Sequence, residues 1–229
     1  MPFGLKNAGA TFQRAMSYAF HDIKHIIKAY LDDLAARSQK RINHSAHLLQ
    51  VFERCRFYNI RLSPNKCVFT VTSSRLLGFI VSSEGIRVDP FKVEAILQLP
   101  PLSSIHQLQS LQGKANFLRR FIVNYAKVTK GFMRLLKKGV PFFWDDFAQC
   151  SFDALKKALT SAPLLSPPDY SRDFLLYLAT AKYTIGMVLV QEVDALYEHV
   201  VYHLSRGLVG PGLWYSLIEK LDLAAIHVF

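Results

Sequence analysis

Two adjacent carboxylates, Asp32 and Asp33, lie between short apolar runs in the stretch Ala-Tyr-Leu-Asp-Asp-Leu-Ala at residues 29–35. Apolar runs on both sides of a polar pair predict a tight β-hairpin with the carboxylates at its tip. Neighbouring side chains on a strand point to opposite faces, whereas in a turn both can approach one divalent cation. Carboxylate oxygens suit Mg²⁺, the ion of two-metal phosphoryl transfer. Most such pairs are solvated turns, so these residues alone leave both interpretations open.

The net charge of +11 is concentrated in the middle of the chain. Residues 1–94 carry a net charge of +7 and residues 145–229 one of −4, while residues 95–144 hold eight Lys/Arg and no Asp or Glu. A solvated surface usually mixes both signs. A block of this length without a carboxylate therefore indicates a surface that meets the phosphates of a nucleic acid.

Within this block, apolar residues recur at three- and four-residue steps, which predicts helices with one buried stripe. The stripe consists of Leu108, Leu111, Ala115, Leu118, Ile122 and Tyr125. Basic residues at similar steps could line another face, interrupted at Gly131. A helix pair with ordinary solvated edges is the alternative to a surface that tracks a nucleic-acid backbone.

Composition bounds the class of protein further. The 229 residues are 51% hydrophobic, enough for one large or two small domains. No stretch approaches twenty apolar residues, and no basic and apolar leader follows Met1, so we expect no membrane partner and a cytoplasmic or nuclear, not secreted, protein. The three cysteines, Cys55, Cys67 and Cys150, fit reduced thiols better than disulfides or a zinc site.

The chain opens Met-Pro-Phe-Gly-Leu-Lys-Asn-Ala-Gly-Ala-Thr-Phe-Gln-Arg, and Tyr-Leu-Asp-Asp follows at residues 30–33. In this order and spacing, the two motifs resemble the reverse transcriptase of the Pol polyprotein of gypsy-type LTR retrotransposons. Later segments resemble the same family through most of the chain. They are residues 62–69, 77–86, 89–93, 119–122, 143–144 and 152–156. Gly9 departs from the pattern, because the family usually has proline there.

The resemblance implies an RNA-directed DNA polymerase that transfers deoxynucleotides from triphosphates to a primer with Mg²⁺, or with Mn²⁺ in its place. Asp32 would be the direct metal ligand and Asp33 a secondary one. Lys66 would donate a proton to pyrophosphate, although a plain surface lysine is an equal alternative. Phe3, Gly4, Gln13 and Arg14 would adjoin the nucleotide and template, and Leu77 and Gly78 the primer terminus. Duplex backbone contacts would come from Arg119, Arg120, Lys127, Lys130 and Arg134.

The same resemblance implies a degenerate ribonuclease H-like region. The family's first catalytic aspartate would fall at Ala179, Glu219 occupies the usual acidic position, and a later aspartate would lie beyond Phe229. We therefore expect no ribonuclease H activity. The remaining palm aspartate and the fingers would precede Met1, so the isolated chain is expected to be nearly inactive, with an upstream Pol segment as a candidate partner.

We expect an α+β fold with four parts. A partial palm, an antiparallel sheet with helices on one side, would span residues 1–88, and a helical thumb residues 89–140. A connection would follow at residues 141–168, and a truncated ribonuclease H-like α/β domain at residues 169–229. Expected partners are an RNA template, an RNA–DNA hybrid or DNA primer, and deoxynucleoside triphosphates. The alternatives are a non-catalytic nucleic-acid-binding remnant and a decayed fragment that does not fold stably.

Overall fold

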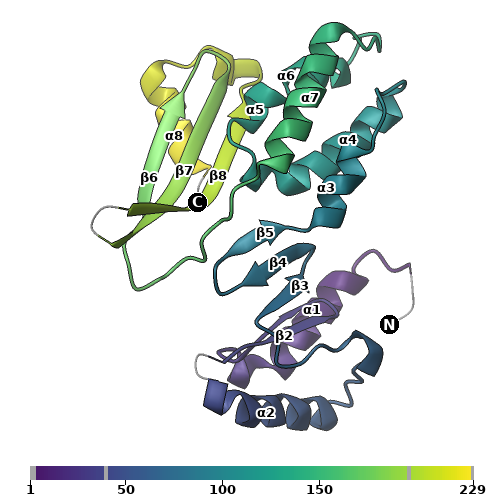
Figure 1. The fold of residues 1–229 in the computed structure, drawn as a ribbon, viewed down its shortest axis with the longest axis vertical. Helices are drawn as coiled ribbons and strands as arrows, with labels where there is room; N and C mark the ends of the chain where they lie inside the picture. Colours follow the sequence, from purple (N-terminus) through teal and green to yellow (C-terminus); the bar gives the residue numbers. More distant parts are fainter. Residues whose placement is uncertain (1–3, 39–40, 195–196, 228–229) are drawn as a thin grey trace. The chain divides into compact units, whose positions relative to one another are not determined.

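The computed structural model describes residues 4–38, 41–194 and 197–227 and combines helices with antiparallel sheets (Figure 1). This confirms the expected α+β class. The chain divides into two compact units, Met1–Leu77 and Gly78–Phe229. Among the described residues, no helix is long and apolar enough to cross a membrane.

The first unit is a hairpin packed on two helices. Strands β1 (Ile27–Tyr30) and β2 (Asp33–Ala36) pair with Tyr30 opposite Asp33. Ile27 is buried in one core with side chains from α1 (Ala8–Ala19) and α2 (His44–Phe57). The unit also contains β3 (Ser73–Leu76) and the 3-10 turns η1 (His21–Ile23), η2 (Arg41–Asn43) and η3 (Pro64–Lys66). Because one hairpin face is covered, the register of the strands is fixed by burial.

The second unit begins with a short hairpin and a group of helices. The hairpin pairs β4 (Phe79–Ser82) with β5 (Ile86–Val88). The longer helices are α3 (Pro90–Leu97), α4 (Ile105–Leu118) and α7 (Asp146–Thr160). The turns η4 (Arg119–Phe121) and η5 (Arg134–Leu136) and the short helices α5 (Tyr125–Val128) and α6 (Lys130–Met133) lie between α4 and α7. All six residues of the expected apolar stripe are buried, which confirms it.

The interruption expected at Gly131 was wrong in its position. Helix α4 already ends at Leu118, and Asn124 adopts a left-handed conformation with a φ of 55°. Gly131 lies inside α6, where a Cβ would collide with the Ser151 hydroxyl and the Phe147 carbonyl oxygen of α7. The Gly131 N–H instead donates to Ser151 Oγ at 3.0 Å. This glycine therefore permits close packing of α6 on α7 rather than ending a helix.

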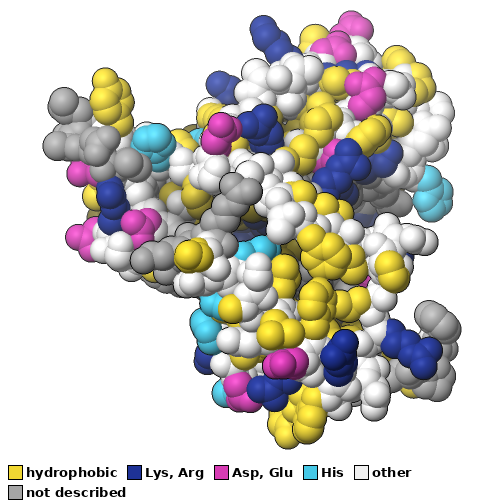
Figure 2. All heavy atoms as spheres, turned by 60° about the horizontal axis from the view of Figure 1, so that its bottom comes forward, with side chains coloured by type: hydrophobic (Ala, Val, Ile, Leu, Met, Phe, Trp, Pro, Cys, Tyr) yellow, Lys and Arg dark blue, Asp and Glu magenta, His cyan; other side chains and the backbone are white. Residues whose placement is uncertain are grey.

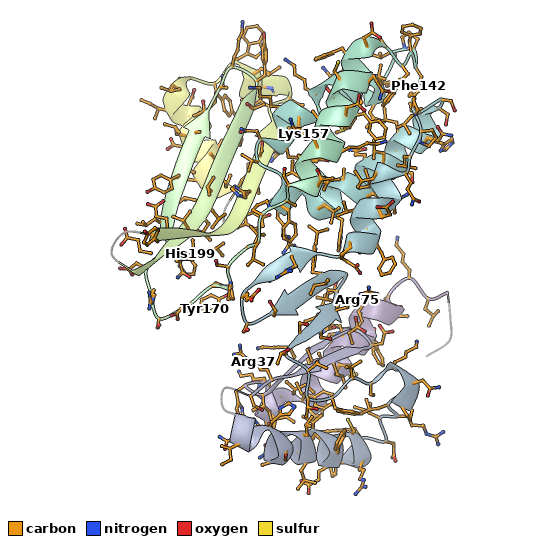
Figure 3. The ribbon with its side chains drawn as sticks, in the orientation of Figure 1. Arg37, Arg75, Phe142, Lys157, Tyr170 and His199 are labelled. Carbon is orange, nitrogen blue, oxygen red and sulfur yellow. The ribbon has the colours of Figure 1, made fainter. Side chains whose placement is uncertain are left out.

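Aromatic side chains fill much of the core of the second unit. Phe132 and Phe152 are fully buried, and Trp144 packs against both. Phe142 lies with its ring centroid 6.3 Å from that of Trp144 (Figure 3). Large aromatic side chains bury more area than any others, so this cluster is a main source of stability for the helical part.

The chain ends in a three-stranded antiparallel sheet. Its strands are β6 (Leu175–Thr180), β7 (Thr184–Asp194) and β8 (Tyr197–Gly207), in that spatial order. The turn η6 (Gly210–Leu213) leads to α8 (Leu217–Ile226), which lies against one face of the sheet (Figure 1). The segment between α7 and β6 contains Pro163, Pro167 and Pro168.

Large hydrophobic side chains reach the surface in both units. Tyr18 and Phe57 are exposed in the first unit and Trp214 in the second, and Figure 2 shows hydrophobic side chains on the drawn face. Single exposed side chains are ordinary, whereas contiguous apolar patches indicate contact surfaces.

Candidate functional site

The paired aspartates lie at the turn of the β1–β2 hairpin. Leu31 and Asp32 form its two-residue loop, and Asp33 begins β2. Both carboxylates are exposed, and no described hydrogen bond or ion pair engages either of them. The predicted hairpin is therefore confirmed with Asp32 in its loop, whereas Asp33 is the first residue of β2 instead of a turn residue. The carboxylate oxygens of both residues are available to a ligand.

The loop is held in a strained conformation. Leu31 has a φ of 51°, in the left-handed region that branched side chains rarely adopt. Such a residue costs about 1–3 kcal/mol and persists only where its surroundings impose it. The imposing group here is the Gln13 side chain of α1. Its Oε1 accepts the Leu31 N–H at 2.6 Å, and its Nε2 donates to the Ala29 carbonyl at 3.0 Å.

Gln13 therefore uses both ends of its amide on the backbone of the hairpin. The sequence motif placed this residue beside nucleotide and template, a role that stays a prediction. The clamp was missed because nothing in the motif shows which backbone groups an amide will reach. The available signal was only a glutamine on the helix that precedes the hairpin, and the structure shows it half-buried.

The other expected nucleotide-site residues of this unit make no described contact with the hairpin. Arg14 is exposed and donates to Thr11 Oγ1 at 3.4 Å. Gly4 is exposed with a φ of 90°, and Lys66 is exposed at the end of η3. Phe3 lies outside the described residues. The structure thus assembles the Gln13 clamp and the two aspartates, and leaves the roles of the others as predictions.

The two aspartates fit part of a Mg²⁺ site. They supply hard oxygen donors on adjacent residues, and Mg²⁺ usually takes one or two carboxylates together with substrate phosphates. Among the described residues, no three His, Cys, Asp or Glu side chains converge as a metal site. Further ligands would therefore have to come from substrate or from other carboxylates.

Leu77 and Gly78 form the turn before β4. Both have a positive φ, of 52° and 77°, as in a type I′ hairpin turn. A Cβ at residue 78 would meet the end of the Lys92 side chain and lie 3.2 Å from Phe117 Cζ. Glycine is thus favoured by the positive φ, and a Cβ would in addition require the Lys92 chain and the Phe117 ring to shift.

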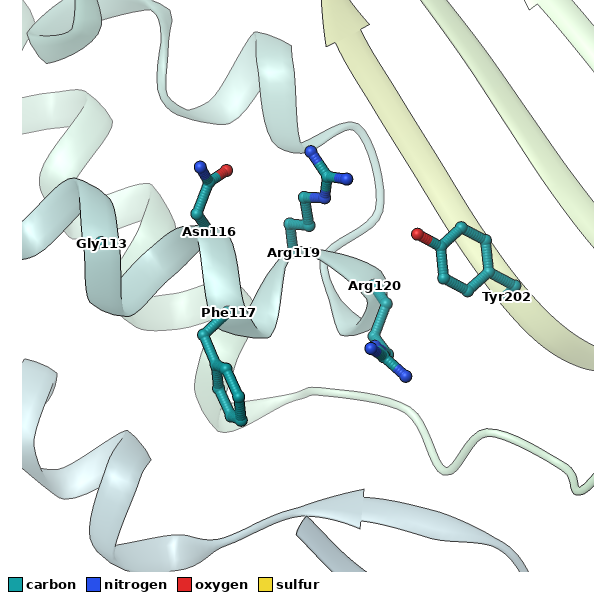
Figure 4. Close-up of a pocket in the computed structure, with 6 residues that line it drawn as sticks. All are labelled: Gly113, Asn116, Phe117, Arg119, Arg120 and Tyr202. Atoms are coloured by element: carbon teal, nitrogen blue, oxygen red, sulfur yellow. The ribbon is translucent and has the colours of Figure 1, made fainter. Parts of the chain in front are cut away.

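Two cationic and three aromatic side chains form a contiguous series next to this turn. Lys92 Nζ lies 4.3 Å from the Phe117 ring centroid, and Phe117 stacks on Phe79 at 4.6 Å. The Arg120 guanidinium follows, 5.0 Å from the Phe79 ring and 5.9 Å from that of Tyr202 on β8 (Figure 4). Cation–π contacts of this kind fix long basic side chains at a surface. The series joins the helical part of the second unit to its sheet.

The expected basic face is divided by these contacts. Arg134 forms an ion pair with Asp145, and its Nε donates to the Gly131 carbonyl at 2.9 Å. The Ala148 N–H and the Arg134 guanidinium lower the pKa of Asp145, which caps α7. Lys130 Nζ lies 5.0 Å from the Tyr183 ring. Arg119 and Lys127 are exposed and form no described ion pair.

In the ribonuclease H-like region, the expected acidic residue Glu219 lies on α8 and has a structural contact. Ala179 lies on β6 opposite Gly186 of β7. Glu219 forms a capping box at the start of α8, where its Oε2 accepts the Ser216 N–H at 2.7 Å. That hydrogen bond lowers the pKa of Glu219. Its carboxylate therefore has a structural partner in place.

Comparisons with known proteins agree with this arrangement. A family model described as reverse transcriptase (RNA-dependent DNA polymerase) matches residues 1–81, and a model of the RNase H-like domain found in reverse transcriptase matches residues 144–229. The Pol polyprotein from transposon 412 of Drosophila melanogaster is 35% identical over 99% of this chain and 18% of its own length. That from transposon gypsy of the same species is 30% identical over 99% of this chain and 23% of its length.

Solved structures give the same result for the fold. The foamy viral protease-reverse transcriptase in complex with RNA/DNA hybrid has a TM-score of 0.86 at 20% identity, over 100% of this chain and 31% of that one. Its complex with dsDNA has a TM-score of 0.83 at 20% identity, over 100% of this chain and 48% of that one.

The fold and the matched regions define a reverse transcriptase followed by an RNase H-like region. The chain belongs to the retrotransposon Pol family, as its motifs led us to expect, and spans about a fifth of the length of the curated relatives described above. Reverse transcriptases and RNase H-like domains generally use divalent metal ions.

Proposed function

We propose that this chain supplies part of the polymerase active site of a Pol protein that carries out RNA-directed DNA synthesis. The observation that carries the proposal is the β1–β2 hairpin, which presents Asp32 and Asp33 on a strained turn fixed by Gln13. Strained backbone that the surrounding structure holds in place is found mainly at functional sites, and here it carries exposed carboxylates.

In the reaction, the primer 3′-oxygen forms a bond to the α-phosphorus of a deoxynucleoside triphosphate, and pyrophosphate leaves. Bound Mg²⁺ would supply charge stabilisation at the attacking and leaving oxygens. Asp32 would be the direct ligand and Asp33 the secondary one, while Gln13 sets the position of the turn. Phe3, Gly4 and Arg14 would adjoin nucleotide and template, and Lys66 would offset the charge of the triphosphate.

Residues from Leu77 onward would hold the primer and the duplex. Leu77 and Gly78 would adjoin the primer terminus. Arg119, Arg120 and Lys127 would contact backbone phosphates, with smaller contributions from Lys130 and Arg134, whose cations have internal partners. The foamy viral relatives, solved with RNA/DNA hybrid and with dsDNA, support a nucleic-acid partner. The proposal includes the four parts of the chain. The palm would end near residue 88, the thumb near residue 140 and the connection near residue 168, and the RNase H-like part would follow.

The test is primer extension on a primed RNA template with Mg²⁺ and then Mn²⁺. The chain replaces the matching residues of the transposon 412 Pol polyprotein, and Asp32→Asn in the same protein is the control. Extension that depends on Asp32 supports the proposal, and a folded chimera without extension contradicts it. The 229-residue chain alone is expected not to extend a primer, because two-metal catalysis needs more converging carboxylates than its described residues bring together.

A non-catalytic nucleic-acid binder is the second candidate. It is favoured by the carboxylate-free block at residues 95–144 and by the loss of an acidic residue at Ala179. Both candidates predict binding to an RNA–DNA hybrid that weakens steeply with salt. Only the polymerase hypothesis predicts primer extension that Asp32→Asn abolishes. Primer extension by the same chimera therefore distinguishes the polymerase from the non-catalytic binder.

A further inference from the structure

The base of the β1–β2 hairpin is bound to α2 through a single hydroxyl group. The pairing of the strands extends one step beyond β2, because the Arg37 N–H donates to the Ile26 carbonyl at 2.8 Å (Figure 3). Ser38 follows directly, and its Oγ lies 3.0 Å from Nδ1 of His44 and 2.7 Å from Nδ1 of His47. Both histidines belong to the first turn of α2. Ser38 therefore joins the second arm of the hairpin to this helix.

Ser38, His44 and His47 form what we call the serine–histidine cluster, and all three are half-buried. Residues three and four apart are neighbours on a helix surface, so the two rings lie on one face of α2. The same face continues with Val51 and Cys55, which are buried in the core that the hairpin shares with α1 and α2. The cluster thus adds a polar contact to the start of a helix face that already packs against the hairpin.

The hydroxyl of Ser38 cannot serve both rings in the same way. A serine hydroxyl has one hydrogen to donate and two lone pairs that accept. It therefore donates to Nδ1 of one histidine and accepts a hydrogen from Nδ1 of the other. When both imidazoles are neutral they must be different tautomers, one with its hydrogen on Nε2 and the other with its hydrogen on Nδ1. The three groups thus form one directed chain of hydrogen bonds, which fixes their orientation more firmly than two independent contacts would.

The hairpin is thereby held by side-chain hydrogen bonds to two different helices. Gln13 of α1 binds the backbone at the turn, next to Asp32, and the serine–histidine cluster binds the end of the β2 arm. Asp33 lies between these two points, five residues before Ser38. A shift of either point would move the two carboxylates, and a misplacement of about 1 Å can reduce a reaction rate by about a hundredfold.

We propose that the serine–histidine cluster positions Asp32 and Asp33 by fixing the β2 arm of the hairpin to α2. This rests on the proposed function, because it assumes that the two carboxylates hold Mg²⁺ in the polymerase reaction. Ser38, His44 and His47 are positioning residues in this role, since they act through the hairpin and not on the substrate. Mg²⁺ demands near-ideal ligand geometry, so its binding should respond most strongly to a loosened arm.

The first test detects the direction of the hydrogen bonds in the 229-residue chain. Nitrogen NMR of the histidine side chains, above the ordinary titration range of histidine, distinguishes the two neutral tautomers. His44 and His47 should differ in tautomer, and Ser38→Ala should abolish the difference. The matched control is Ser45→Ala, which removes an exposed hydroxyl of α2 between the two histidines that makes no described hydrogen bond. The same tautomer at both rings of the wild type would overturn the proposal.

A second test uses the position of the contacting atom of His47. Asparagine carries its amide atoms on Cγ, as histidine carries Nδ1, whereas glutamine places them one bond farther out. His47→Asn should therefore keep the contact with Ser38 and His47→Gln should lose it, although glutamine is the better helix former. Hydrogen exchange at the Arg37 amide should become about tenfold faster in His47→Gln, the equivalent of one lost hydrogen bond, and stay unchanged in His47→Asn. Equal exchange in both variants would contradict a contact through Nδ1.

The positioning role itself is tested in the transposon 412 chimera. Ser38→Ala should raise the Mg²⁺ concentration for half-maximal primer extension about threefold to tenfold and leave the dissociation constant of the primed template unchanged. A loss of folded protein would lower the rate at every Mg²⁺ concentration without moving this midpoint. An unmoved midpoint in Ser38→Ala, or an equal shift in Ser45→Ala, would overturn the proposal.

The tests separate the serine–histidine cluster from the polymerase reaction. The tautomer and exchange measurements need no catalysis, so they succeed or fail with the cluster alone. An inactive wild-type chimera would contradict the polymerase proposal and the positioning role with it, whereas the tautomers would still establish the hydrogen-bonded cluster. An active chimera with matching tautomers at His44 and His47 would leave the polymerase proposal standing and overturn only the cluster.

Discussion

The β1–β2 hairpin and the β6–β8 sheet use their acidic positions in opposite ways. In the hairpin, Asp32 and Asp33 are exposed and without a described partner, on a turn strained at Leu31 and clamped by Gln13. In the sheet, Ala179 has no carboxylate, and Glu219 caps the helix that covers the sheet. The hairpin keeps its carboxylates exposed on a turn whose strained conformation lowers the stability of the fold. In the sheet region, the Glu219 carboxylate stabilises α8 through the capping box.

Under the proposed function, the hairpin serves chemistry, whereas Glu219 of the RNase H-like region serves structure. A clamp on a strained turn has no use for folding alone, because the unstrained turn would be more stable. A capping box needs no function beyond satisfying helix N–H groups. The same family ancestry has thus left two regions whose residues should respond differently to substitution.

The largest contrast is expected for catalysis. In the transposon 412 chimera, Asp32→Asn should reduce primer extension by at least about a thousandfold, because a lost metal ligand removes several kcal/mol of transition-state stabilisation. Glu219→Gln should leave the extension rate within about twofold, since this residue acts only on α8. Initial rates at saturating nucleotide check both. A comparable loss from Glu219→Gln would erase the distinction between the regions.

The next contrast concerns the clamp. Gln13→Leu keeps the size of the side chain but leaves the Leu31 N–H and the Ala29 carbonyl without their partner, and should lower the free energy of unfolding by about 2–3 kcal/mol. Urea unfolding measures this, and hydrogen exchange at the Leu31 amide localises it. Gln50→Leu, an exposed glutamine on α2 of the same unit, is the control and should change stability by less than about 0.5 kcal/mol. An unprotected Leu31 amide in the wild type would contradict the clamp.

Sequence alone predicted the parts of this molecule that follow from periodicity and motif order. The buried stripe from Leu108 to Tyr125 and the hairpin at Asp32 and Asp33 were confirmed, because burial period and turn chemistry are local properties. The break predicted at Gly131 was wrong in position, because α4 ends at Leu118 and the left-handed turn falls at Asn124. Gly131 packs against α7 instead. Tertiary contact decides such points, and it has no local signal.

The site was less predictable than the fold for the same reason. From the sequence alone, Arg134 and Arg120 cannot be distinguished, because both are basic residues of the same helical block. The structure pairs Arg134 with Asp145 and places Arg120 between Phe79 and Tyr202. Tyr202 is eighty-two residues from Arg120, so no spacing rule connects them. Which cations remain available to a phosphate is thus a property of packing.

A smaller effect is expected at the helix cap of the sheet region. Ser216→Ala should lower the free energy of unfolding by about 1 kcal/mol. Ser216→Asp should keep most of the stabilisation from the cap, because aspartate is also a good N-cap residue. Glu219 contributes to the same box with a lowered pKa, so its share is present above about pH 4.5 and is lost as the pH falls through the lowered folded value. Urea unfolding at pH 7 and at pH 3 checks both statements. The same loss from Glu219→Gln at both pH values would show that the Glu219 carboxylate adds nothing.

The smallest effect is expected at Gly9, where the hairpin region departs from its family. Gly9 lies in the first turn of α1 without a positive φ, and a Cβ there would lie 3.8 Å from Leu31 Cδ2, an ordinary contact. Gly9→Ala should therefore raise the free energy of unfolding by about 0.5–1 kcal/mol by restricting the unfolded chain. Thermal unfolding measures the change, with Gly113→Ala on α4, where a Cβ would meet no atom within 4 Å, as the control in the other unit. Because the new methyl would touch the strained residue itself, a gain at Gly9 that exceeds the gain at Gly113 would show that packing from α1 supports the turn. A lower stability of Gly9→Ala would instead mean that Leu31 can adopt its strained conformation only when no side chain at residue 9 contacts it.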